Sequence, residues 1–176
     1  MEPIRIGDKL INKSKLFSQI ETMLNLRIQG FSQQDVAKEF GTDRAFVSRL
    51  ESLGEIRKGG KVALVAFPIS NKKEIATLAA KEGIEYCLLF TEKERWDFVK
   101  SRSGPELLND VMGFVTKLKG NDVVIVAASD MRIHSAQALL DKQVMGISLG
   151  ESPIEEDKYL EPQLITKIMA SLQGRY

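Results

Sequence analysis

The stretch KVALVAFPISNKKEIATLAAKEG (residues 61–83) decides the fold class of this chain. It opens with a continuous, partly β-branched apolar run, which is typical of a strand covered on both faces. Pro68 and the polar residues near it mark a turn. Three apolar residues then share one face of a helix that a glycine ends: Ile75, Leu78 and Ala79, followed by Gly83. The stretch predicts a buried strand followed by an amphipathic helix.

The same alternation continues to the end of the chain. Further apolar runs predict strands at residues 85–90, 122–128 and 144–149. Amphipathic segments predict helices at 92–119, interrupted near 101–105, and at 131–142 and 162–173. Alternating strands and helices favour a parallel sheet with helices on both faces. We therefore expect residues 61–176 to form a mainly parallel, four-stranded, Rossmann-like α/β domain.

Polar residues follow two of the predicted strands. They are Ser70, Asn71, Ser129 and Asp130. In open parallel sheets, ligands bind beyond the carboxyl ends of the strands. These four residues are thus candidates for binding a small-molecule effector, although plain helix capping also explains Ser70 and Asn71.

Catalytic and cofactor motifs are missing from the sequence. Neither glycine-rich phosphate-binding pattern occurs, so no nucleotide cofactor is expected. His134 is the only histidine, and its spacing from Asp130 on a predicted helix favours a surface pair over catalysis. One histidine and one cysteine, without clustered acidic ligands, predict no metal site. The sequence therefore favours a protein that is not an enzyme.

The composition is that of an ordinary globular protein, with 43% hydrophobic and 28% charged residues among 176. No apolar run reaches the roughly 18 to 20 residues of a membrane span, and the N-terminus lacks the pattern of a secretion signal. A cytoplasmic protein is the expectation. Cys87, the only cysteine, lies in the apolar run YCLLF and is predicted to be a buried structural thiol. Trp96 is predicted to lie in the core.

The chain before the α/β domain has a helical texture, with apolar residues three or four apart. The short polar hinge KGGK (58–61) separates the two parts, so we expect domains at 1–60 and 61–176. Residues 1–60 hold ten Lys/Arg and eight Asp/Glu, net +2, and the remainder is net −1. Any binding of DNA must therefore depend on where individual charges are placed.

The first domain contains SQQDVAKEFGTDRAFVSRLE (32–51). Ser32 is a good N-cap for a first helix, and Asp43 caps a second helix that begins at Arg44. Gly41 suits a tight turn between the two helices. Ala37 is small enough to let the helices cross closely, and Val47 fills the crossing. This spacing meets the mechanical requirement of a helix-turn-helix.

These residues resemble the lambda-repressor/Cro type of helix-turn-helix, with a support helix at about 14–29. Nine positions match the pattern of that family: Ser32, Gln33, Val36, Ala37, Phe40, Gly41, Val47, Ser48 and Glu51. The sequence departs from it at Asp43, where Ser or Thr is usual. It also departs after Glu51, where the family usually adds one or two more helices. The resemblance covers about residues 14–53 and does not extend to the α/β domain.

The resemblance implies roles for residues that match the motif by position. Gln33 is expected to contact a phosphate and brace the second helix. Four residues are expected to face the major groove: Arg44, Ala45, Ser48 and Arg49. An arginine can hold guanine O6 and N7, and Ala45 can meet a thymine methyl group. Arg57 and Lys58, with Lys61, are expected phosphate contacts. Phe46 is open between a groove contact and a core or subunit contact.

The sequence thus favours a sequence-specific transcriptional regulator that binds double-stranded DNA. One such head reads only a few base pairs, so we expect a homodimer on a pseudo-palindromic site. The α/β domain would dimerise and sense a small molecule. The first alternative is an α/β small-molecule-binding protein or enzyme whose helical head is an interaction module that binds no DNA. The second is an architectural DNA-binding protein without an effector.

Overall fold

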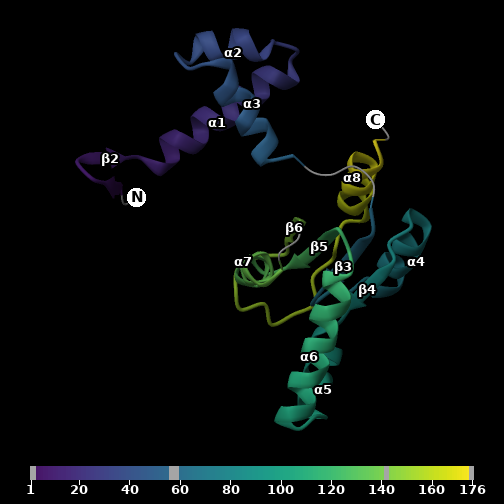
Figure 1. Cartoon of the computed structure of the whole chain (residues 1–176). Coiled ribbons are helices and arrows are strands. Elements are labelled where there is room, and N and C mark those ends of the chain that lie inside the picture. The colour runs from purple at the N-terminus through teal and green to yellow at the C-terminus, as the bar shows by residue number, and fades with distance from the viewer. Residues whose placement is uncertain (1–2, 56–59, 141–142, 175–176) are drawn as a thin grey trace. The chain divides into compact units, whose positions relative to one another are not determined.

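The computed structural model describes residues 3–55, 60–140 and 143–174 (Figure 1). The chain divides into two compact units, Met1–Glu55 and Ile56–Tyr176. Among the described residues, no helix has the length and apolar character that crossing a membrane requires.

The first unit contains a short hairpin and three helices. The hairpin pairs β1 (Ile4–Ile6) with β2 (Lys9–Ile11) in antiparallel register, and the sequence analysis did not predict it. The helices are α1 (Lys13–Ile28), α2 (Gln33–Glu39) and α3 (Arg44–Leu53). Their limits lie close to the support helix that the resemblance implied and to the helix starts that the caps Ser32 and Asp43 predicted.

A small core holds the three helices of the first unit together. Its buried members are Met23, Val36, Ala37 and Val47. The caps are those expected from the sequence: Ser32 forms a capping box with Asp35, and the Asp43 carboxylate accepts a hydrogen bond from the Phe46 amide at 2.7 Å. Gly41 has a φ of +63°, which favours glycine between α2 and α3.

The second unit has the predicted α/β fold, with four parallel strands in the order β4-β3-β5-β6. The strands are β3 (Val62–Ala66), β4 (Tyr86–Leu89), β5 (Val123–Ala128) and β6 (Gln143–Ser148). The helices are α4 (Lys72–Glu82), α5 (Glu92–Lys100), α6 (Gly104–Lys119), α7 (Asp130–Leu139) and α8 (Pro162–Gln173). The interruption expected near 101–105 separates α5 from α6.

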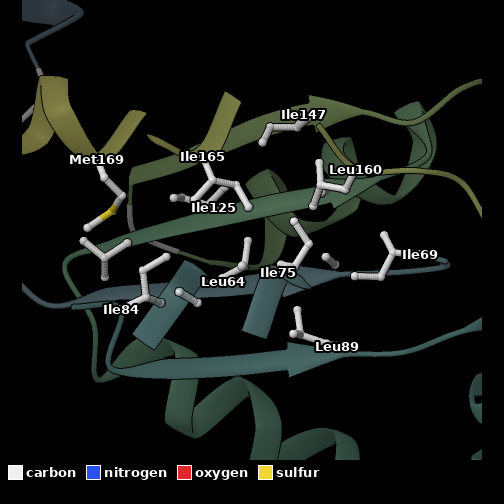
Figure 2. Close-up of a cluster of buried hydrophobic side chains, with 14 of the residues drawn as sticks. Leu64, Ile69, Ile75, Ile84, Leu89, Ile125, Ile147, Leu160, Ile165 and Met169 are labelled. Atoms are coloured by element: carbon white, nitrogen blue, oxygen red, sulfur yellow. The ribbon is translucent and has the colours of Figure 1, made fainter. Parts of the chain in front are cut away.

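Helices cover both faces of this sheet, so the central strands are apolar along their whole length. On one face, side chains of α4 and α8 pack on alternate strand residues, among them Leu64 and Ile125 (Figure 2). On the other face, α6 and α7 pack on the residues between, such as Ala63 and Val124. All residues of β3 and β5 are buried. This burial explains the uninterrupted apolar runs that defined these strands.

Two predictions of burial were wrong. Cys87 is exposed, because β4 forms an edge of the sheet and one side of it has no neighbouring strand. Trp96 is 48% exposed on α5, where its indole N–H donates to the Glu92 carboxylate at 2.7 Å. Cys87 lies in an apolar run that suits a core strand, whereas Trp96 lies in a helix whose residues are mostly charged and of which none is buried.

Candidate functional site

The helix α3 presents its predicted DNA-contacting residues on one side. Arg44, Ala45 and Arg49 are exposed and Ser48 is half-buried, whereas Val47 is only 1% exposed. Successive residues of a helix are rotated by about 100°, so Ala45 and Arg49 point away from Val47, while Ser48 lies about 100° and Arg44 about 60° around the helix from it. Phe46 lies outside this group, is 44% exposed, and is not part of the core of the first unit.

A chain of polar contacts positions the start of α3. The Glu51 carboxylate accepts one hydrogen bond from Arg27 Nε at 2.5 Å and another from Gln33 Nε2 at 2.7 Å. Gln33 Oε1 in turn accepts from Arg44 Nε at 3.3 Å. The contacts join α1, α2 and α3. Gln33 therefore braces the helix pair, and its amide nitrogen already has an acceptor other than a phosphate. Arg27 was not among the residues predicted from the sequence.

The Arg27–Glu51 contact makes a testable contribution to the stability of the first unit. Hydrogen bonds from Arg27, and then from Gln33, lower the pKa of Glu51. Stability from a lowered carboxyl pKa is present above the unfolded value, about 4.3, and is lost as the pH falls through the lower folded value. Both side chains are 30% exposed, so we expect only about 1 kcal/mol near neutral pH.

We therefore expect Glu51→Gln to lower the opening free energy of α3 amides by about 1 kcal/mol near neutral pH. Hydrogen exchange on the full chain measures this quantity. The difference from the natural chain should shrink at acid pH, as the pH falls through the lowered folded pKa of Glu51 and this carboxyl becomes protonated. Glu39→Gln, on the exposed surface of α2, is the matched control and should change little. A deficit of the same size at both pH values would contradict this role of the charge.

The other predicted phosphate contacts lie outside the described part of the first unit. Arg57 and Lys58 lie outside the described residues. Lys61 belongs to the second unit, where its ammonium lies 3.2 Å from the Glu85 carboxylate. The structure therefore describes only the α3 part of the predicted DNA contact set.

Ser70 and Asn71, the candidate ligand residues that follow β3, form hydrogen bonds to the segment before α8. The exposed Ser70 donates its amide to the Lys158 carbonyl at 2.9 Å. Asn71 is the N-cap residue of α4, as the capping alternative predicted, but its side chain makes no capping hydrogen bond. Its side chain instead donates to the Leu160 carbonyl and accepts from the Leu160 amide. These contacts attach the segment before α8 to the sheet.

The candidates that follow β5 lie at the start of α7. The buried Ser129 hydroxyl accepts a hydrogen bond from the Ser152 hydroxyl at 2.7 Å. The Asp130 carboxylate accepts from the Ser152 amide at 3.0 Å. Among the described residues no ion pair joins Asp130 to His134, so the predicted surface pair was wrong. The backbone amides near Asp130 satisfy its carboxylate instead, and His134 is exposed.

A cavity of about 480 Å³ lies at this end of the sheet, within the second unit. Its apolar lining comes from the segments after β3 and β6 and from α5 and α7: Phe67, Pro68, Val99, Met131, Pro153 and Ile154. Its other lining residues are Arg95, Trp96, Ser129, Arg132 and Ser152. Of the four predicted ligand residues, only Ser129 lines the cavity. The lining residues that were not predicted lie on α5 and α7 and in the segments after β3 and β6.

Comparison with known proteins adds no family assignment. No protein-family model matches the chain, and no curated protein or solved structure matches it. The chain is an α/β protein with a separate helical N-terminal unit.

Proposed function

We propose that this protein is a sequence-specific DNA-binding transcriptional regulator that reads DNA through α3. One observation carries the proposal. The helix α3 leaves Arg44, Ala45 and Arg49 exposed and Ser48 partly exposed on one arc of its surface, while Val47 packs into the core of the first unit. An exposed helix face with two arginines, fixed by a buried crossing and a capped turn, is what a recognition helix requires.

The dimensions of α3 suit the major groove of DNA. Ten residues of helix extend about 15 Å, and the groove is about 12 Å wide, so it admits one helix. In helix-turn-helix proteins the N-terminal residues of the recognition helix contact base edges. Arg44 is the first residue of α3, and Arg49 lies little more than one turn further on.

In this proposal each residue has its own role. Arg44 and Arg49 donate to guanine O6 and N7, Ala45 meets a thymine methyl group, and Ser48 donates to or accepts from a base edge. The hydrogen bond from Arg44 Nε to Gln33 Oε1 holds the Arg44 side chain in position at the start of α3. These roles agree with the resemblance of the motif to lambda-repressor/Cro proteins.

A homodimer is part of the proposal, because one recognition helix reads only a few base pairs. The second unit carries a surface suited to self-association on α6. Leu108, Val111 and Met112 are 63%, 42% and 57% exposed, and their spacing places them on neighbouring positions of the helix. An apolar cluster of this kind favours contact with another protein surface. We propose that the second copy of the chain packs there.

Binding of DNA can be tested first without knowledge of the operator. The full chain should bind a short random-sequence duplex at low salt, as measured by fluorescence anisotropy. Affinity should fall steeply between about 50 and 200 mM salt, because phosphate contacts release counterions from the duplex. Absence of binding at about 50 mM salt would contradict the proposal and favour a helical unit that contacts protein instead.

A further inference from the structure

We propose that the cavity of the second unit binds a small organic acid with an aromatic or other apolar body. The anionic group would lie at the start of α7, near Arg132 and the two serine hydroxyls. The apolar body would lie against Phe67 and Trp96. This proposal is independent of DNA binding, because every residue that lines the cavity belongs to the second unit.

The cavity occupies the place where parallel sheets bind ligands. The strand order β4-β3-β5-β6 means that the chain leaves β3 toward one edge and later returns to its other side at β5. The crevice beyond the carboxyl ends of two such strands is the usual ligand site of open α/β sheets. Phe67 directly follows β3 and Ser129 directly follows β5, and both line the cavity.

Two arginines line the cavity, Arg95 and Arg132, and they differ in whether a carboxylate already pairs with them. Arg95 is already paired, since its guanidinium donates to Glu92 Oε1 at 2.7 Å. The indole of Trp96 donates to the same oxygen at 2.7 Å, so Glu92 fixes both side chains in the wall. Arg132 is exposed and has no hydrogen bond or ion pair from its side chain to any other described residue. Arg132 is therefore the cation available to a ligand.

Hydrogen-bond donors gather at the same end of the cavity. Ser129 and Ser152 lie at the start of α7, where the first amides are already paired: that of Asp130 donates to the Gly150 carbonyl and that of Met131 to the Asp130 carboxylate. Ser129 is 5% exposed, and its hydroxyl lies 2.7 Å from that of Ser152. Both serines line the cavity together with Arg132, and because the Ser152 hydroxyl already donates to Ser129, the Ser129 hydroxyl and Arg132 are the donors left for a ligand. A carboxylate or phosphate group can accept hydrogen bonds from such a set.

The rest of the lining defines the body of the ligand. A volume of about 480 Å³ lies within the range of small-molecule sites, roughly 300 to 1,000 Å³. Phe67, Trp96 and Ile154 offer an apolar wall that an inorganic ion leaves unfilled. An organic acid with an aromatic ring satisfies both the charged end and this wall.

Trp96 provides a direct signal for the test, because it is the only tryptophan of the chain. The full chain is titrated with benzoate, phenylacetate and phenyl phosphate, and with benzamide, phenylacetamide and phenol as their uncharged partners. Inorganic phosphate is a separate probe. Trp96 fluorescence and the melting temperature are the two readouts. At least one of the organic acids should bind saturably, and about tenfold more tightly than its uncharged partner and than inorganic phosphate.

The variant Arg132→Gln should weaken binding of that acid by about tenfold and leave the uncharged partner unchanged. Arg132 is exposed, so the substitution should leave the fold intact. Lys167→Gln, on the exposed surface of α8 and outside the cavity, is the matched control and should leave binding unchanged. Three results would overturn the proposal: no saturable binding by any organic acid, equal binding of an acid and its uncharged partner, or equal effects of the two substitutions.

Discussion

Replacing Arg44 and Arg49 together by alanine is expected to weaken binding of the full chain to the DNA site that it selects by about a hundredfold or more. Each arginine that holds a guanine contributes about 1–3 kcal/mol of discrimination against other bases, and 1.4 kcal/mol corresponds to a tenfold change in affinity. Binding to unrelated duplexes should fall much less, because phosphate contacts supply most of that affinity.

The double substitution should leave the fold of the first unit intact, because the two arginines contribute little to its stability. Both are exposed, and the only described side-chain contact between them and the rest of the unit is the 3.3 Å hydrogen bond from Arg44 to Gln33. Lys167→Ala, on α8 of the second unit, removes a positive charge elsewhere and serves as the control. Anisotropy titrations with the selected site and with a scrambled duplex measure both affinities. Retention of the full sequence preference by the double variant would show that α3 does not read the DNA.

Replacing Ile125 by alanine is expected to cost the second unit about 2–5 kcal/mol of its free energy of unfolding. Ile125 is fully buried in β5, whose neighbours are β3 and β6. Its side chain belongs to the core that α4 and α8 cover (Figure 2). Two effects contribute to this loss of stability. The substitution removes apolar contacts, and it leaves a cavity because the surrounding side chains relax only in part.

Urea denaturation of the full chain, followed by fluorescence of Trp96 in the second unit, measures this loss. Leu139→Ala is the matched control, since Leu139 lies at the end of α7 and is 56% exposed. It should change the free energy by no more than about 0.5 kcal/mol. Equal effects of the two substitutions would contradict the position of Ile125 in the core.

The main elements of the fold could be predicted because their signals are local. The apolar runs at β3 and β5 are continuous since both faces of each strand are buried. Gly41 and Asp43 mark the turn and the start of α3 through their own backbone preferences. The hairpin of β1 and β2 escaped prediction, because strands of three residues are too short to show a clear alternation.

The candidate site was only partly predictable, because the sheet order decides it. Ser129 was identified from its place after a strand, and it does line the cavity. Arg95 follows β4 and Arg132 follows β5. Both line the same cavity because β4 and β5 lie on either side of β3, an order that a single sequence does not reveal. The same lack of strand order explains the wrong prediction for Cys87, which lies on the edge strand β4.

We propose that the two α3 helices of a homodimer bind one DNA site. Selection of bound fragments from random duplex DNA by the full chain tests it most directly. We predict an enriched inverted repeat, with half-sites about 10 base pairs apart, that is lost when Arg44 and Arg49 are replaced. Absence of any enriched sequence, or equal enrichment by the variant that lacks both arginines, would contradict the claim.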